Sequence, residues 1–193
     1  MAKIMNPDAK LDNKFNKKQQ LATLAGGCFW CIEGAFSQVV GILCATSGYM
    51  GGSSTAPTYE DICTGATGHA EVVQLNFDPA LISYQEILEI FFTLHDPTQL
   101  NRQGNDIGSQ YRSAVFYHDQ SQKIIAEKII QEMADDKMFE QAIVTKVDPA
   151  QTFYSGEEYH QDYVNNNPES QYCQAVVSPK LAKFRQTFVN KLK

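Results

Sequence analysis

Residues 21–36 read LATLAGGCFWCIEGAF. The first five residues form a short mixed run that predicts a buried strand, and Gly26-Gly27 ends it. Apolar side chains then recur three or four positions apart, which predicts a helix over residues 29–39. The segment is therefore a strand, a sharp turn and a helix, with Cys28 at the turn.

Outward from this segment, short apolar runs predict further strands, and apolar stripes at helical spacing predict further helices. The strands are expected over residues 42–47, 71–77, 112–117 and 142–147. Helices are expected after Ser83, over residues 120–134 and over residues 179–192. Residues 48–59 and 101–110 are polar and contain glycine, which predicts long loops.

Two of these helices allow more specific predictions. Ser83 is expected to cap its helix, with Glu86 three residues later as its capping-box partner. Over residues 120–134, four isoleucines are expected to point inward: Ile124, Ile125, Ile129 and Ile130.

The element order is strand, helix, strand, strand, helix, strand, which is the split βαβ pattern. We predict an α+β fold: a two-layer ferredoxin-like α/β plait with long loops and a C-terminal extension. Residues 1–18 become rich in Asn and Lys and are expected to be a flexible tail. With no sign of a boundary further on, residues 19–193 are expected to form a single domain.

Composition excludes several functions. The chain has 193 residues, 43% of them hydrophobic, and a net charge of −6. The negative balance argues against non-specific nucleic-acid binding. No apolar run reaches about 18 residues, and there is no secretory signal, so no membrane segment is expected. Five unevenly spaced cysteines do not suggest a secreted disulfide framework, so a cytoplasmic location is expected.

Cys28 is placed as a nucleophile would be, because the start of a helix stabilises a thiolate and lowers a thiol pKa. Cys31 lies one helical turn later, which leaves three interpretations of the pair: a metal half-site, a thioredoxin-like dithiol, or a nucleophile in a substrate pocket. A metal needs more ligands than the isolated remaining cysteines provide, so none is expected. Phe29 and Trp30 favour the third interpretation, because two aromatics beside a nucleophile can enclose a small apolar group.

Several further blocks accompany the Gly-Cys-Phe-Trp sequence. They are GYMGG at 48–52, TY at 58–59, TGHAE at 67–71, DPT at 96–98, RQGNDIGSQYRS at 102–113, FY at 153–154 and EEYHQDY at 157–163. From Leu21 to Tyr172, in this order, they resemble the A-type peptide methionine sulfoxide reductases. The resemblance implies reduction of the S epimer of methionine sulfoxide, free or in oxidised proteins.

The resemblance also implies roles for individual residues. The nucleophile is Cys28 and the acid that protonates the leaving oxygen is Glu71. Three residues bind the polar oxygen side: Tyr59, Asp106 and Tyr111. The substrate methyl group lies against Phe29 and Trp30.

Regeneration of the enzyme involves a second thiol, because one turnover leaves Cys28 as a sulfenic acid. Cys31 replaces the glycine of many family members, and Cys173 lies in a segment that can carry a recycling cysteine. We expect Cys173 to be the main resolving thiol, in a mobile segment, with Cys31 as second choice or relay. Cys44 and Cys63 are expected to be packing residues.

The reductant that this scheme requires is thioredoxin or a dithiol such as dithiothreitol, with no bound cofactor. Two rival hypotheses remain: a general disulfide oxidoreductase that uses Cys28 and Cys31 alone, and a redox sensor that signals through a Cys28 disulfide.

Overall fold

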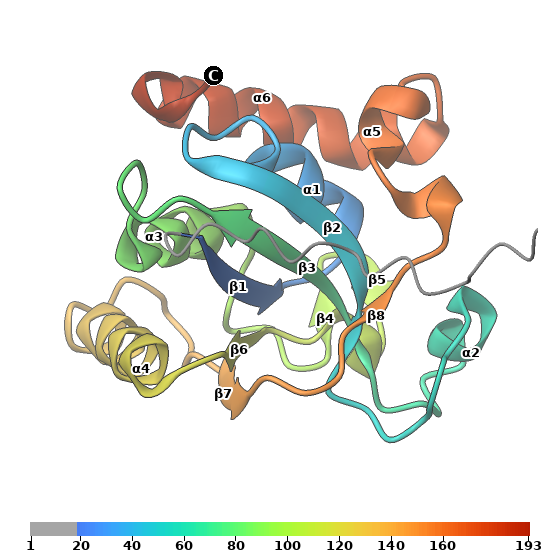
Figure 1. The fold of residues 1–193 in the computed structure, drawn as a ribbon, viewed down its shortest axis with the longest axis horizontal. Helices are drawn as coiled ribbons and strands as arrows, with labels where there is room; N and C mark the ends of the chain where they lie inside the picture. The colour runs from blue at the N-terminus through green and yellow to red at the C-terminus, as the bar shows by residue number, and fades with distance from the viewer. Residues whose placement is uncertain (1–18) are drawn as a thin grey trace, which may run out of the picture.

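The protein has a mixed α+β architecture around a six-stranded sheet (Figure 1). The computed structural model describes residues 19–193, so the tail expected over residues 1–18 lies outside the described residues. In the order β7-β6-β1-β3-β2-β8, all neighbouring strands are antiparallel except β6 and β7, which are parallel. The strands are β1 (Gln20–Ala25), β2 (Ile42–Met50), β3 (Ala70–Phe77), β6 (Ala114–Tyr117), β7 (Lys146–Pro149) and β8 (Tyr154–Ser155).

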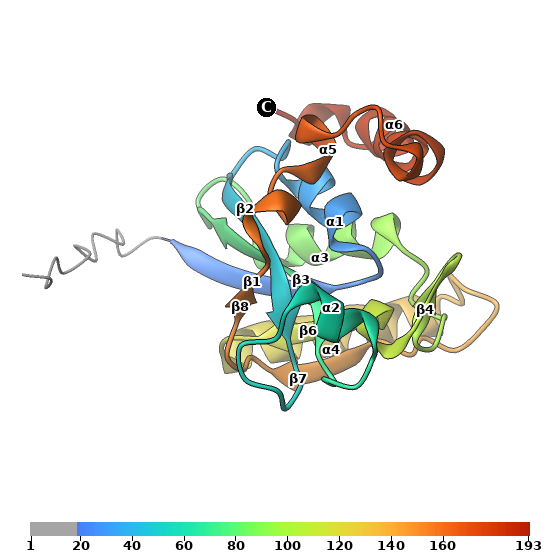
Figure 2. The same cartoon turned by 90° about the vertical axis from the view of Figure 1, so that its right-hand side faces the viewer.

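Helices cover one face of this sheet. Figures 1 and 2 show α1 and α3 next to the sheet and α6 beyond α1. The helices are α1 (Phe29–Phe36), α2 (Tyr59–Cys63), α3 (Tyr84–Leu94), α4 (Gln120–Asp135), α5 (Tyr163–Asn166) and α6 (Ser178–Thr187). Among residues 19–193, no helix is long and apolar enough to cross a bilayer.

Short elements complete the chain. A separate hairpin consists of β4 (Arg102–Gln103) and β5 (Asp106–Ile107). A π-helical turn, η3 (Cys173–Val177), runs directly into α6. The 3₁₀ turns are η1 (Ser109–Tyr111), η2 (Glu158–His160) and η4 (Val189–Lys191).

Side chains along β3 alternate between the two faces of the sheet, and this alternation determines which of them face the helices. Val73, Leu75 and Phe77 belong to the main core under the helices, whereas Ala70 and Val72 belong to a smaller core on the other face. Successive strand residues point to opposite faces, so Glu71 lies on the same face as Val73. The sequence therefore directs this carboxyl group into the interior, where it is 2% exposed.

The expected helix at 29–39 ends at Phe36, and the expected helix at 179–192 ends at Thr187. Both ends have one cause. The chain terminus pairs with residues 38–40: the Val40 amide donates to the Lys191 carbonyl, and the Lys193 amide donates to the Gln38 carbonyl. This bridge replaces the final helical turns that periodicity alone predicted.

Two predictions about the third quarter of the chain are wrong. The strand expected at 142–147 is β7, which begins only at Lys146, because the Val144 amide donates to the Pro97 carbonyl outside the sheet. Ile124 does not point inward and is 56% exposed. The inward position is taken by Gln122, whose amide donates to the Leu21 carbonyl at 2.7 Å.

The predicted capping box of α3 is confirmed. The Ser83 hydroxyl accepts from the Glu86 amide at 3.2 Å, and the Glu86 carboxylate accepts from the Ser83 amide at 2.9 Å. Two of the amide groups at this helix end, those of Ser83 and Glu86, are thereby paired.

Ser83→Ala is therefore expected to lower the free energy of unfolding by about 1 kcal/mol, the usual cost of losing an N-cap. Urea denaturation measures this, with Ser121→Ala on the exposed face of α4 as the control. Equal stability of the two variants would contradict the assigned cap.

Candidate active site

The turn between β1 and α1 places Cys28 at the start of a helix. Gly27 has φ +89°, and a Cβ there would approach the Gln103 side chain to 2.6 Å, so glycine fits this position on both counts. Cys28 then serves as the N-cap residue of α1 with an extended backbone, and its side chain is 8% exposed. The predicted strand, turn and helix are confirmed.

Glu71 meets this turn from β3. Its Oε2 accepts a hydrogen bond from the Phe29 amide at 3.0 Å, inside the protein. Burial and the neighbouring Cys28 sulfur raise the pKa of Glu71 well above its usual range, and the Phe29 amide opposes this only in part. Both causes favour the protonated, neutral form of the Glu71 carboxyl group.

The two side chains open into one cavity of about 310 Å³. All seven residues predicted for catalysis and substrate binding line it, and Tyr163 and Tyr172 complete the wall. The lining comes from α1, α2, β3, β5, η1 and the segment after η2. The seven predicted residues are Cys28, Phe29, Trp30, Tyr59, Glu71, Asp106 and Tyr111.

One side of the cavity is aromatic. Trp30 stacks on Tyr163 with ring centroids 3.7 Å apart and planes 7° from parallel. Tyr172 meets Trp30 edge-on, with ring centroids 5.7 Å apart, and the Phe29 ring lies 6.1 Å from Trp30. This packing holds the indole in one orientation.

The other side is lined by hydroxyl and carboxyl groups. Burial, and then the nearby Glu71, raise the pKa values of Tyr59 and Tyr111, so both keep their protons at any physiological pH. Tyr172 donates a hydrogen bond to Asp106 Oδ2 at 2.7 Å, and its hydroxyl is close enough to Cys28 to act on the pKa of that thiol. The cavity thus combines an apolar wall, hydrogen-bond donors and a thiol.

The expected lowering of the Cys28 pKa is wrong for the substrate-free protein. Burial is the main cause of a raised pKa, and the adjacent Cys31 thiol adds to it. The Tyr172 hydroxyl and the Trp30 amide act in the opposite direction and are outweighed. Cys28 lies at the start of a helix as predicted, but the free-energy cost of placing a charge in this interior exceeds the stabilisation that the helix start gives to a thiolate.

The remaining cysteines differ from expectation in their exposure. Cys173 is fully buried within η3 and close enough to Cys31 to affect its ionisation, so it does not lie on an open segment. Cys44 and Cys63 are exposed rather than packed. Cys44 follows a bulge in β2, and α2, which ends at Cys63, buries only Ile62.

Sequence reasoning missed Tyr163, Tyr172 and His160. Aromatic residues are frequent in this part of the chain, and nothing in their spacing separates a cavity wall from core packing. The neighbouring Cys173 was the one available signal for Tyr172.

Comparison with known proteins identifies the family. A sequence model described as peptide methionine sulfoxide reductase matches residues 20–192. The chain belongs to this family. Peptide methionine sulfoxide reductase MsrA of Polynucleobacter asymbioticus is 51% identical over 86% of this chain and 88% of that protein. The MsrA of Saccharolobus solfataricus is also 51% identical, over 90% and 97%.

Solved structures of peptide methionine sulfoxide reductases share the fold. Reduced Mxr1 from Saccharomyces cerevisiae matches with a TM-score of 0.75 and 36% identity, over 81% of this chain and 90% of that one. Methionine sulfoxide reductase A of Corynebacterium diphtheriae matches with a TM-score of 0.71 and 32% identity, over 81% and 78%. Mxr1 has also been solved in complex with Trx2, and that form matches with a TM-score of 0.55 and 28% identity, over 80% and 91%.

Because burial raises the Cys28 pKa, alkylation of Cys28 by iodoacetamide is expected to be slow at neutral pH in the substrate-free reductase. Its rate should rise only above the ordinary thiol range of about 8.5. Peptide mass spectrometry across pH measures this, and the exposed Cys44 and Cys63 peptides control for the reagent. A midpoint near or below neutrality would show that the helix start dominates after all.

Proposed function

We propose that the protein reduces the S epimer of methionine sulfoxide to methionine, in oxidised proteins and as the free amino acid, with Cys28 as nucleophile. The observation that carries this proposal is the buried bond from the Phe29 amide to Glu71. It holds a carboxyl group of raised pKa beside a thiol, in a cavity with one apolar and one polar wall. A disulfide oxidoreductase that uses Cys28 and Cys31 alone has no use for this acid.

The cavity suits the three parts of a methyl sulfoxide. The methyl group lies against Phe29 and Trp30, and the sulfur faces Cys28. The oxygen accepts hydrogen bonds from Tyr59, Tyr111 and the Glu71 carboxyl group, while Asp106 orients this polar side through Tyr172. Such hydrogen bonds strengthen as negative charge develops on the oxygen.

The chemical step transfers oxygen between two sulfur atoms. The Cys28 thiol loses its proton as its sulfur bonds to the sulfoxide sulfur, and Glu71 donates its proton to the sulfoxide oxygen. The oxygen passes to Cys28 as the original S–O bond and the newly formed bond between the two sulfur atoms break. Cys28 becomes a sulfenic acid, oxidised by two electrons, and methionine leaves, reduced by two. The lost thiol proton restores the acid form of Glu71.

Substrate binding assists ionisation of Cys28. When Glu71 and the tyrosines bind the sulfoxide oxygen, the sulfoxide sulfur gains positive character next to the thiol. A nearby positive centre favours the thiolate and offsets the burial that raises the Cys28 pKa. The nucleophile is then reactive chiefly when substrate is present.

Recycling proceeds through Cys31 to Cys173. The Cys31 thiol is close enough to Cys28 to raise the pKa of that thiol, and Cys173 is close enough to Cys31 to affect its ionisation. A disulfide between residues three apart in a first helical turn is strained and is readily passed on. Cys173 remains the main resolving thiol, and local opening of η3 presents its disulfide to a reductant.

Thioredoxin is the proposed reductant, with dithiothreitol as a laboratory substitute and no bound cofactor. Support comes from the solved complex of the similar yeast protein Mxr1 with Trx2. All five cysteines are free thiols, which suits a reducing compartment such as the cytoplasm. The net charge of −6 argues against nucleic-acid partners.

The finer description of the proposed fold is a ferredoxin-like plait within a single catalytic domain, residues 19–193. The antiparallel order β6-β1-β3-β2, with α1 and α3 as the crossovers, supports the plait. The strands β7 and β8 add to its edges.

Replacement of the proposed acid is expected to slow chemistry far more than binding. Glu71→Gln keeps the shape of the side chain and lacks the proton, so kcat should fall about 100- to 10,000-fold with little change in KM. Steady-state assays with methionine S-sulfoxide and dithiothreitol measure this. Cys28→Ser, which has no activity in this scheme, sets the background rate. A Glu71→Gln rate within threefold of the original would mean that another group supplies the proton.

The recycling route is tested by one turnover without reductant. After one equivalent of substrate, mass spectrometry should find a disulfide that includes Cys173, and Cys173→Ser should trap the bond between Cys28 and Cys31. Turnover with thioredoxin should fall in Cys173→Ser. Unchanged turnover in that variant, with a Cys28–Cys31 disulfide in the original protein, would make Cys31 the main resolving thiol.

A further inference from the structure

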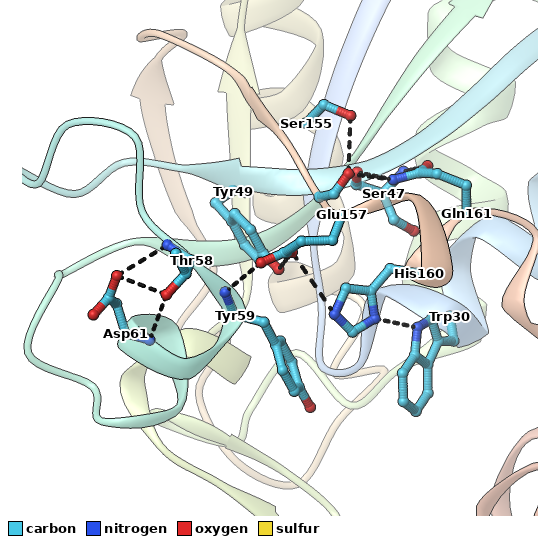
Figure 3. Close-up of polar contacts among 11 residues, drawn as sticks. Trp30, Ser47, Tyr49, Thr58, Tyr59, Asp61, Ser155, Glu157, His160 and Gln161 are labelled. Carbon is cyan, nitrogen blue, oxygen red and sulfur yellow. Dashed lines mark hydrogen bonds and ion pairs between the residues drawn. The ribbon is translucent and has the colours of Figure 1, made fainter.

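Glu157 contacts the main chain of the cavity residue Tyr59 and lies beside His160, which contacts Trp30 (Figure 3). Its Oε2 accepts a hydrogen bond from the hydroxyl of Tyr49, a fully buried residue of β2, at 2.8 Å. Its Oε1 accepts from the backbone amide of Tyr59, the first residue of α2, at 2.7 Å. One carboxylate therefore fixes the helix end that carries Tyr59 to the central sheet.

His160 continues this contact to Trp30. Its Nδ1 accepts a hydrogen bond from the indole Nε1 of Trp30 at 3.2 Å, and the His160 side chain is 1% exposed. An indole N–H can only donate, so Nδ1 carries no proton. The proton of the neutral ring is then on Nε2, which lies 3.9 Å from Glu157 Oε2 and has no hydrogen-bond partner in the described structure.

The charges agree with this arrangement. Burial acts to raise the pKa of Glu157, but the Tyr59 amide and the other donors outweigh it, so Glu157 is ionised. Burial lowers the pKa of His160 more than Glu157 raises it, so the ring is neutral at physiological pH. The rings that pack on His160 are Tyr59 at 4.4 Å, Tyr159 at 4.2 Å and Phe29 at 5.0 Å.

We propose that Glu157 is a positioning residue that sets the substrate selectivity of the cavity. The negative charge of Glu157 favours the His160 tautomer in which Nδ1 is unprotonated. In that tautomer, Nδ1 accepts the hydrogen bond from the indole of Trp30 and holds it in place. Trp30 in turn limits the space that is open to the alkyl group on the substrate sulfur. The same carboxylate holds the main chain of Tyr59. The inference rests on the proposed function, because it concerns the methyl pocket of that reaction.

Glu157→Gln separates the effect of Glu157 on the His160 tautomer from its contact with the Tyr59 main chain. The amide oxygen still accepts from the Tyr59 amide, and the amide nitrogen can donate to the Tyr49 hydroxyl. That nitrogen then faces His160 Nε2, where a second N–H is unfavourable. The ring proton moves to Nδ1, and the bond to Trp30 is lost. Glu158→Gln is the matched control, because it removes the same charge from the adjacent, exposed residue.

The test compares methionine S-sulfoxide with ethionine S-sulfoxide, which carries one more carbon on the sulfur. In Glu157→Gln, KM for the methyl substrate should rise with a smaller change in kcat. The methyl-over-ethyl ratio of kcat/KM should fall about tenfold, the factor that corresponds to a lost hydrogen bond of ordinary strength. Trp30 is the only tryptophan in the chain, so its emission should change in Glu157→Gln and not in Glu158→Gln.

Substitutions at His160 give a second test that does not depend on Glu157. His160→Asn keeps an acceptor near Nδ1 and should retain most of the selectivity, whereas His160→Leu should lose it. Selectivity and Trp30 emission equal to the control in Glu157→Gln, or equal selectivity in the Asn and Leu variants, would overturn the proposal. A wild-type protein that reduces neither sulfoxide would instead refute the proposed function.

Discussion

The hydrogen bond from the Phe29 amide to Glu71 connects the parts of this protein that the proposed reaction needs. The amide belongs to the first turn of α1, directly after Cys28, and the carboxyl group belongs to the central strand β3. Glu71 reaches the Phe29 amide because it is one of the alternate residues of β3 that face the helices. Burial raises the pKa of Glu71 and the pKa of Cys28 alike, so acid and nucleophile share one environment.

Around this bond, the cavity is lined by elements that are far apart in the sequence. The segment from Glu157 to Tyr172 closes it from the C-terminal side: Tyr163 stacks on Trp30, and Tyr172 reaches Asp106. Because Cys173, the proposed resolving thiol, follows Tyr172 directly, the proposed substrate binding and recycling involve the same segment. Local opening there would expose Cys173 and release one wall of the cavity together.

Local signals in the sequence were sufficient where a feature depends on neighbouring residues. The Gly-Gly turn before Cys28 and the Ser83–Glu86 cap are such features, because backbone freedom and i, i+3 contacts determine them. Distant contacts overruled the local pattern elsewhere. Ile124 points outward because Gln122 is held by Leu21, about a hundred residues away. The Cys28 pKa depends on total burial, which no sequence window reveals, and the positions of Tyr163 and Tyr172 depend on where the C-terminal segment packs.

We propose that Glu71 is a protonated acid at neutral pH in the resting protein. Infrared difference spectroscopy, the original protein minus Glu71→Gln, tests it most directly, because a protonated carboxyl group has a carbonyl stretch well separated from carboxylate bands. The account predicts this stretch at pH 7, sensitive to deuterium exchange and lost only at pH well above the usual carboxyl range. A difference spectrum at pH 7 that contains only carboxylate bands would contradict it.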